Sequence, residues 1–155
     1  MTLLKQEFYL ILPDIRSSHN VGAMFRTADA CGIDQIFLVG YTPVPPRPDI
    51  AKVALGAETW MKWKQYKNLK TLVKNLQKKG VKVVALEKTE KSVDISSSKF
   101  DFPLALIVGN EVDGVPREIL DLCDHIIHIP MLGKKGSLNV SIAAGIAMYA
   151  IAQKR

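Results

Sequence analysis

The sequence predicts a single α/β domain in which a mostly parallel sheet carries helices on both faces. Short apolar runs alternate with segments of helical periodicity along the chain, which is typical of βαβ units. The 155 residues have the length of one domain, so we expect residues 1–155 to fold together. Apolar residues make up 48% of the chain and charged residues 23%, a globular balance that excludes a disordered tail or a coiled coil.

The first elements follow from short apolar runs and the residues that end them. Residues 8–12 form an apolar run that Pro13 stops, which indicates a buried strand. Apolar residues recur at helical spacing over residues 20–31, with a cap expected at residues 18–20. Residues 36–39 predict a second strand. Four prolines between residues 43 and 48 then predict an exposed loop.

The second half of the chain continues the alternation. Residues 68–79 have the pattern of an amphipathic, lysine-rich helix. Pro116 suits the first turn of a helix that we expect to run to about Cys123. Three further strands and a last helix rich in small residues are predicted at residues 81–86, 104–108, 125–129 and 138–153.

The positive charge is concentrated in one segment of the chain. The net charge is +6, yet residues 52–82, here called the lysine-rich segment, contain nine lysines and one acid and carry +8. Lys70, Lys74 and Lys78 recur every four residues, so a solvated helix face is one interpretation. The other is a surface that neutralises the phosphates of a nucleic acid.

The compartment is inferred from what the sequence lacks. Cys31 and Cys123 lie far apart with no CxxC motif, which predicts neither a zinc site nor a disulfide and fits a reducing environment. The N-terminus has no signal-peptide pattern, and no apolar run approaches the roughly 18 residues of a membrane span. We therefore expect a cytoplasmic protein without a membrane partner.

Several common sites are excluded by spacing. Gly109 and Gly114 have the separation of a phosphate loop, but Val115 and Pro116 follow where Lys and Ser or Thr are needed. No GxGxxG follows a strand. His125 and His128 point to opposite sides of a strand, so no metal site is predicted there. Neither Ser137 nor Ser141 has a nearby histidine for a hydrolase triad.

Polar residues in loops and at helix starts remain as candidates for chemistry. In open α/β sheets, ligands bind beyond the carboxyl ends of strands, where such residues gather. They are Asn20, Arg26, Glu111, Ser137 and Asn139. Taken singly, Asn20 and Asn139 are better explained as helix caps, Arg26 as a surface charge and Glu111 as a loop acid.

Taken together, these residues fall in three segments that resemble the motifs of the SpoU/TrmH family, a group of SPOUT-class RNA ribose 2′-O-methyltransferases. The first reads Asn-Val-Gly-Ala-Met-Phe-Arg-Thr-Ala, the second Ile-Val-Gly-Asn-Glu with a later glycine, and the third Ile-Pro-Met followed by Ser-Leu-Asn-Val-Ser and two alanines. The three segments begin at residues 20, 107 and 129. The resemblance covers residues 8–152, and the three motifs in order are far more specific than the first alone.

The resemblance implies a fold, a cofactor and an activity. It implies a SPOUT α/β-knot, with a trefoil knot formed by the C-terminal segment, and a homodimer. It implies S-adenosylmethionine as methyl donor, no metal, and the ribose 2′-OH of tRNA or rRNA as acceptor. A noncatalytic RNA-binding or assembly protein on the same scaffold, or a base methyltransferase, are the alternatives.

The resemblance also implies roles for individual residues. Arg26 would be the main catalytic residue, acting on the donor site of the partner subunit, with Asn20, Glu111 and Asn139 orienting it and the ribose. The donor would be held largely by backbone groups, around Leu86, Gly109, Ile129, Met131, Leu132, Ser137 and Leu138.

RNA must then be bound by the catalytic domain itself, because we expect no separate RNA-binding domain. The candidates are basic residues of the lysine-rich segment and of two loops. They are Arg26, Arg47, Lys52, the lysines of residues 62–82, Lys134 and Lys135.

Overall fold

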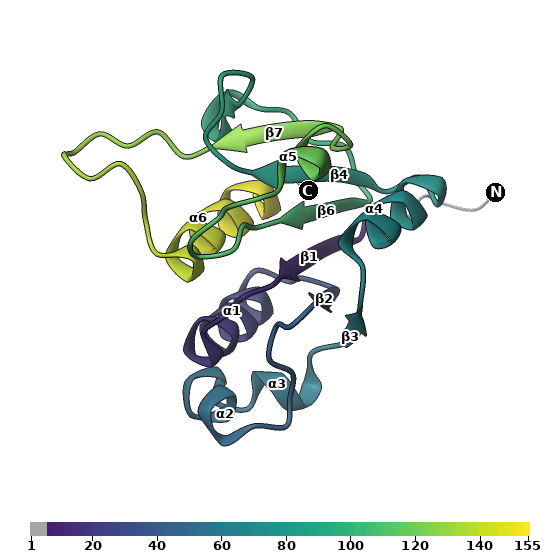
Figure 1. Cartoon of the computed structure of the whole chain (residues 1–155), viewed down its shortest axis with the longest axis vertical. Coiled ribbons are helices and arrows are strands. Elements are labelled where there is room, and N and C mark those ends of the chain that lie inside the picture. Colours follow the sequence, from purple (N-terminus) through teal and green to yellow (C-terminus); the bar gives the residue numbers. More distant parts are fainter. Residues whose placement is uncertain (1–5) are drawn as a thin grey trace.

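A computed structural model describes residues 6–155 and contains one seven-stranded sheet in which every pair of neighbouring strands is parallel (Figure 1). The strand order is β3-β2-β1-β6-β4-β7-β5. The strands are β1 (Phe8–Pro13), β2 (Gln35–Val39), β3 (Trp63–Tyr66), β4 (Lys82–Leu86), β5 (Val93–Asp94), β6 (Leu104–Ile107) and β7 (His125–His128). The predicted parallel α/β fold class is confirmed.

Helices cover both faces of this sheet. The elements are α1 (Ser18–Ala30), α2 (Pro48–Ala54), α3 (Ala57–Trp60), α4 (Leu69–Lys78), the 3₁₀ helix η1 (Ile95–Ser97), α5 (Arg117–Leu120) and α6 (Val140–Ala152). Leu10 and Leu12 of β1 are buried with α1, α2 and α6 on one face, whereas Ile11 is buried with α4 and α5 on the other. Central parallel strands are buried on both sides, so they read as continuous apolar runs.

Three details differ from the sequence-based expectations. Strands β3 and β5 were not predicted, because both are short edge strands in which half of the residues are polar. The proline-rich stretch is not wholly an exposed loop, since Pro45 is buried and Pro48 begins α2. A proline is well tolerated in the first helical turn, where its missing N–H has no partner to lose. Helix α5 ends at Leu120, before Cys123.

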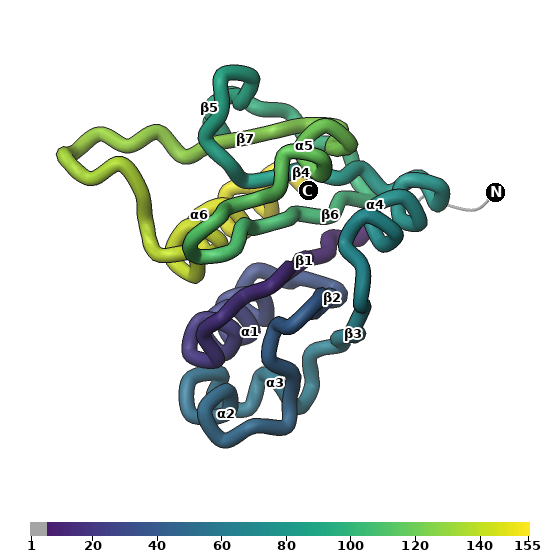
Figure 2. Tube along the Cα trace, viewed as in Figure 1, coloured from purple at the N-terminus to yellow at the C-terminus, as the bar shows by residue number. Residues whose placement is uncertain are grey.

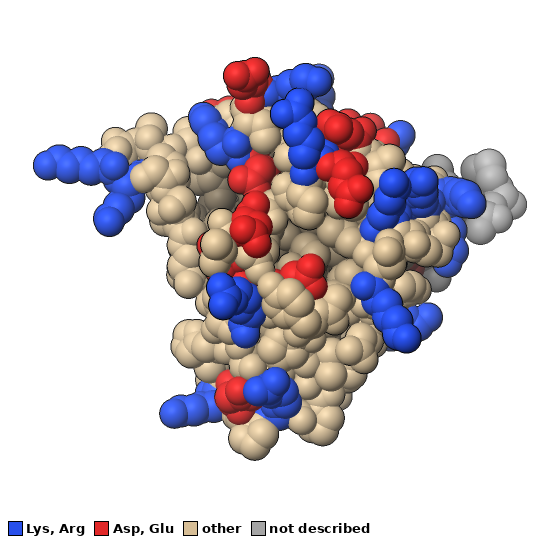
Figure 3. Space-filling model, in the orientation of Figure 1, with Lys and Arg blue, Asp and Glu red and all other residues tan. Residues whose placement is uncertain are grey.

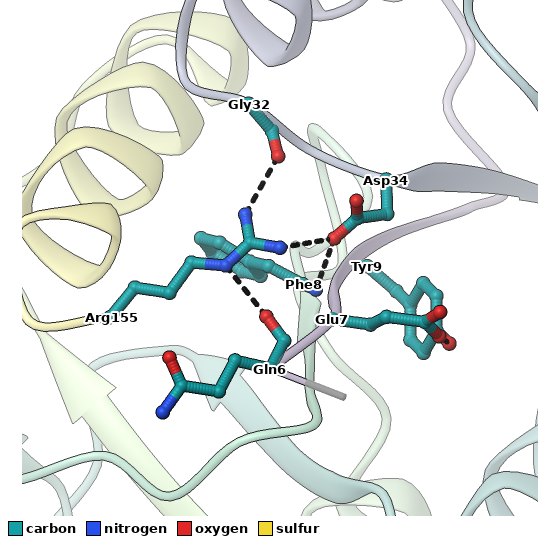
Figure 4. A network of polar contacts seen from close by, with 7 residues as sticks. All are labelled: Gln6, Glu7, Phe8, Tyr9, Gly32, Asp34 and Arg155. Atoms are coloured by element: carbon teal, nitrogen blue, oxygen red, sulfur yellow. Dashed lines mark hydrogen bonds and ion pairs between the residues drawn. The ribbon is translucent and has the colours of Figure 1, made fainter. Parts of the chain in front are cut away.

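The chain beyond α6 is tied to the start of the sheet. The Arg155 guanidinium pairs with Asp34 at 2.6 Å and donates hydrogen bonds to the carbonyl oxygens of Gln6 and Gly32 (Figure 4). Asp34 also accepts from the backbone N–H of Phe8 at 2.8 Å. These contacts join α6 to β1 and β2. The trefoil knot that the resemblance implies remains a prediction.

The segment between β7 and α6 protrudes from the body of the molecule (Figure 2). Residues 130–139 are all exposed.

No helix within residues 6–155 has the length and apolarity to cross a bilayer.

Helices α1 and α2 pack so closely that one position of α1 requires glycine. A Cβ atom on Gly22 would lie 2.6 Å from the carbonyl oxygen of Ile50 and 3.0 Å from Cβ of Val53. We expect Gly22→Ala to lower the free energy of unfolding by about 1–3 kcal/mol, because the helices must move apart. Urea denaturation measures this, with Gly133→Ala as control, since a Cβ there meets nothing within 4 Å. Equal stability of the two variants would contradict the packing.

Candidate functional site

Three of the candidate residues are joined by hydrogen bonds at the carboxyl edge of the sheet. The side-chain amide of Asn20 donates to Oε2 of Glu111 at 3.2 Å, and Oδ1 of Asn20 accepts from Nδ2 of Asn139 at 3.3 Å. Asn20 lies in the first turns of α1, Glu111 in the loop after β6 and Asn139 immediately before α6. Residues 91 and 119 positions apart are thereby brought into one cluster.

Local structure explains why each residue of this cluster is held in place. Asn139 is the N-cap of α6, and its Oδ1 accepts from the backbone N–H and the hydroxyl of Ser141. The sequence predicted that one of residues 18–20 caps helix α1. The structure instead has Ser17 as the cap. Asn20 is therefore not a cap, and its buried side chain is free to link Glu111 to Asn139.

Glu111 accepts several hydrogen bonds from the start of α1. Its carboxylate accepts from the backbone N–H of Arg16 at 2.9 Å and of Ser17 at 3.0 Å. Burial raises the pKa of Glu111, but these N–H groups and the Asn20 amide outweigh it and hold the pKa below its ordinary value. The carboxylate is therefore charged at neutral pH and fixes the loop after β6 to α1.

This lowered pKa predicts how stability depends on pH. A carboxyl whose pKa is lower in the folded state stabilises the fold above its unfolded pKa of about 4.3, and the contribution is lost as pH falls through the folded pKa. We expect Glu111→Gln to be less stable at pH 7 by less than about 1 kcal/mol, since the side chain is partly exposed. The difference should shrink as the pH falls below about 4.3.

Urea denaturation of both proteins at pH 7 and pH 3 checks this expectation. Glu118→Gln is the matched control, because Glu118 is exposed on α5. A stability difference for Glu111→Gln that is the same at both pH values would contradict the charged role of this carboxylate.

A hollow of about 460 Å³ opens beside this cluster, between the ends of β4 and β7 and the start of α6. We call it the β4–α6 hollow. Five of the residues predicted to hold a donor line it, namely Leu86, Ile129, Met131, Ser137 and Leu138. The other lining residues, which were not predicted to hold the donor, are Glu87, Lys88, His128, Gly136 and Ala143. Glu87 and Lys88 directly follow β4, and this position after the end of a strand is the signal by which they could have been found.

Leu132 and Gly109 were also predicted to hold the donor, but they do not line the β4–α6 hollow. The side chain of Leu132 is 96% exposed on the protruding loop and does not line the β4–α6 hollow. Gly109 approaches another part of its own loop, since a Cβ there would lie 2.7 Å from Cα of Gly114. The glycine is thus required by the tight loop that carries Glu111.

Arg26 lies in a second hollow of about 890 Å³, the α1–α2 hollow. Its other cationic lining residues are Arg16, Arg47 and Lys52, with His19 beside them. Arg47 is partly neutralised by Asp49 at 2.9 Å. Arg26 follows Asn20 by six residues and so projects from another face of α1, away from the hydrogen-bonded cluster. Within one chain, Arg26 lines the α1–α2 hollow and not the β4–α6 hollow.

The predicted RNA-binding residues divide into three places. Arg26, Arg47 and Lys52 share the α1–α2 hollow, and Lys134 and Lys135 are exposed on the protruding loop. The lysines of residues 62–82 are exposed on or beside β3 and α4, with Lys82 at the start of β4, and basic side chains gather over β3 and α4 in Figure 3. Within residues 6–155, no group of three or more His, Cys, Asp or Glu side chains is placed to hold a metal ion.

Two curated relatives match almost the whole chain. The 23S rRNA (guanosine-2′-O-)-methyltransferases RlmB of Vibrio parahaemolyticus and Vibrio cholerae are 36% and 35% identical to it over 146 and 151 residues. These matches cover 94% and 97% of the chain but 59% and 61% of the relatives. The chain thus spans about three fifths of the length of the curated relatives it matches.

Solved structures and a family model agree with these relatives. An AdoMet-bound rRNA methyltransferase from Sinorhizobium meliloti superposes with a TM-score of 0.88 at 30% identity, covering 95% of this chain and 56% of that one. For the TrmH/SpoU tRNA modifying enzyme of A. aeolicus, the TM-score is 0.87 at 28% identity, covering 98% and 77%. The model of the SpoU rRNA Methylase family matches residues 7–149. This chain belongs to the SpoU rRNA methylase family.

Proposed function

We propose that this chain is an RNA methyltransferase that uses S-adenosylmethionine to methylate a ribose 2′-OH of tRNA or rRNA. The observation that carries the proposal is the hydrogen-bonded cluster of Glu111, Asn20 and Asn139, which stands at the carboxyl edge of the sheet beside the β4–α6 hollow. Ligands of open α/β sheets bind at this edge. The names of the RlmB relatives support the same reaction class.

The β4–α6 hollow fits the donor in size and chemistry. Its volume of about 460 Å³ falls in the usual range for small-molecule sites. Its lining combines the apolar side chains of Leu86, Ile129 and Leu138 with the polar Glu87 and Ser137, which suits a molecule with an aromatic base and a charged amino-acid end. When bound, S-adenosylmethionine supplies an electrophilic methyl group on a positively charged sulfur.

In this proposal, Arg26 positions the acceptor. The planar guanidinium donates in a fixed fork that can hold an RNA phosphate and the adjacent ribose oxygen together. Arginine stays protonated in proteins, so Arg26 acts by orientation and by stabilising negative charge rather than by taking the proton. Asn20, Glu111 and Asn139 fix the start of α1, on which Arg26 stands.

The proposal includes a homodimer, because one chain separates Arg26 from the β4–α6 hollow. Helix α6 presents an exposed apolar face formed by Ile142, Ile146 and Tyr149, which are 55%, 43% and 63% exposed. Their spacing of four and three residues puts them on one side of the helix. Apolar surface of this kind marks a protein interface, and we infer that a second copy covers it and brings Arg26 to the partner's hollow.

The state of the two cysteines fits the cytoplasmic location that we propose for this protein. Cys31 and Cys123 are both unpaired thiols, which suits the reducing cytoplasm. Burial, together with the charge of Asp124, raises the pKa of the Cys123 thiol to about 12, so that thiol stays neutral.

The proposal is tested with a methyl donor labelled on its methyl group. Incubation with total tRNA and, separately, with rRNA from a strain that lacks the gene should place label in one of them. Titration calorimetry should show donor binding without RNA. A noncatalytic RNA-binding protein would bind RNA but give neither donor binding nor label, and that combination would contradict the proposal.

A further inference from the structure

A third concavity lies on the opposite face of the sheet from α1 and is not part of the sites described above. It is a groove of about 640 Å³ between α4 and the strands β1, β2 and β3, here called the α4–β3 groove. Glu7, Gln35, Val81 and Pro103 line it, and each stands at or just before the start of a strand. The groove therefore lies toward the amino edge of the sheet, whereas Glu111 follows the carboxyl end of β6.

Three aromatic rings form a continuous row along the floor of this groove. Tyr9, Phe37 and Tyr66 come from β1, β2 and β3, and all three line the groove. The ring centroids of Tyr9 and Phe37 are 5.7 Å apart, and those of Phe37 and Tyr66 are 5.6 Å apart, both in edge-to-face geometry. Phe37 is only 5% exposed, whereas the two tyrosines at the ends of the row are half-buried. The tyrosines thus offer partly open rings to a ligand.

Basic side chains border the same groove. Lys64 lies on β3 and points to the groove side, and Lys78 and Lys79 stand at the end of α4. The acidic lining residue is Glu7, whose carboxylate accepts a hydrogen bond from the Tyr9 hydroxyl. Further exposed lysines on α4 and on the turn before it, namely Lys67, Lys70 and Lys74, extend the positive surface, which Figure 3 shows over α4 and β3.

The lysine-rich segment contributes residues to both this groove and the α1–α2 hollow. Lys52 lines that hollow, whereas Lys64 on β3 and Lys78 and Lys79 at the end of α4 line the groove. The two sites therefore share one strongly basic stretch of sequence, with nine lysines and one acid. Both sites present positive charge that attracts an anionic polymer.

We propose that the α4–β3 groove binds a single-stranded segment of the RNA substrate, with unpaired bases against Tyr9 and Tyr66 and phosphates near Lys64, Lys78 and Lys79. Single-stranded nucleic acids are bound in this way, by aromatic rings that stack on bases inside a positively charged channel. A duplex keeps its bases stacked on one another and cannot use the rings. The inference rests on RNA being the partner in the proposed function, and it adds a second docking site outside the reaction centre.

The test uses a fluorescently labelled twelve-nucleotide oligouridine and a blunt RNA duplex of the same length as probes. Tyr66→Leu removes a stacking ring but keeps an apolar side chain. We expect it to weaken oligouridine binding about tenfold and to leave duplex binding unchanged. Lys78→Gln with Lys79→Gln should reduce the slope of log affinity against log salt by about 1.4 for the single strand. Lys91→Gln with Lys99→Gln, two exposed lysines elsewhere, is the matched control and should leave that slope unchanged.

The outcomes separate this inference from the proposed function. If the wild-type protein binds oligouridine and both groove variants bind it equally well, the α4–β3 groove is not the docking site. Equal weakening of single strand and duplex by Tyr66→Leu would also overturn the inference, because stacking would not explain it. If the wild-type protein binds neither probe nor tRNA nor rRNA, the proposed function itself fails. With an RNA that the wild-type protein methylates, the groove variants should show a higher KM for that RNA and an unchanged kcat.

Discussion

Replacing Arg26 with alanine should reduce methyl transfer to RNA by at least about 100-fold, because the reaction loses a preorganised, positively charged hydrogen-bond donor next to the ribose oxygen that accepts the methyl group. Binding of S-adenosylmethionine should change little, because the proposal places the guanidinium of Arg26 on the RNA phosphate and ribose rather than on the methyl donor. The free energy of unfolding should not change either, because this side chain is exposed.

The measurement is single-turnover transfer of labelled methyl groups, with calorimetry of donor binding on the same preparations. Arg26→Lys should restore little, because an ammonium group lacks the planar fork of a guanidinium. Arg117→Ala, at an exposed arginine on α5, is the control and should retain full activity. Undiminished transfer by Arg26→Ala would remove this residue from the site.

The second large effect is expected from the exposed apolar face of α6. Ile146→Arg places a charge in the middle of the face formed by Ile142, Ile146 and Tyr149, and burying an unpaired guanidinium between two copies is strongly unfavourable. We expect this variant to be a monomer and to lose methyl transfer to the level of Arg26→Ala, because Arg26 no longer reaches a partner's hollow. Analytical ultracentrifugation and transfer assays measure the two effects.

Val93→Arg is the matched control, since Val93 is an exposed apolar residue on β5.

Mixing two inactive variants, Arg26→Ala and Ala143→Phe, gives the sharper test, because Ala143 lines the β4–α6 hollow and the larger side chain fills it. Mixed dimers contain one intact combination of Arg26 and hollow, so random exchange should recover about a quarter of the wild-type activity. A fully active Ile146→Arg monomer would contradict the shared site.

The central strands were predictable because each is buried on both faces and therefore appears as an apolar run. Edge strands lack that signal, and β3 places Lys64 and Gln65 between two aromatic residues. Helix α2 lacks a sequence signal for a different reason, because proline usually interrupts a helix, whereas Pro48 occupies a first-turn position.

The site was predictable in its composition but not in its geometry. The motif resemblance named Asn20, Glu111 and Asn139, yet only the fold shows that they are hydrogen-bonded to one another. It also shows that Arg26 lies in a different hollow. The aromatic row of Tyr9, Phe37 and Tyr66 has no signature along the sequence, because strand pairing alone brings these distant residues together.

The position of the transferred methyl group tests the account most directly. RNA labelled by the wild-type protein is digested to nucleosides, and these are separated and identified by mass spectrometry. We expect the label in a 2′-O-methylnucleoside, whose free base carries none after the glycosidic bond is cleaved. Label that remains with the base would contradict ribose methylation and identify a base methyltransferase on the same fold.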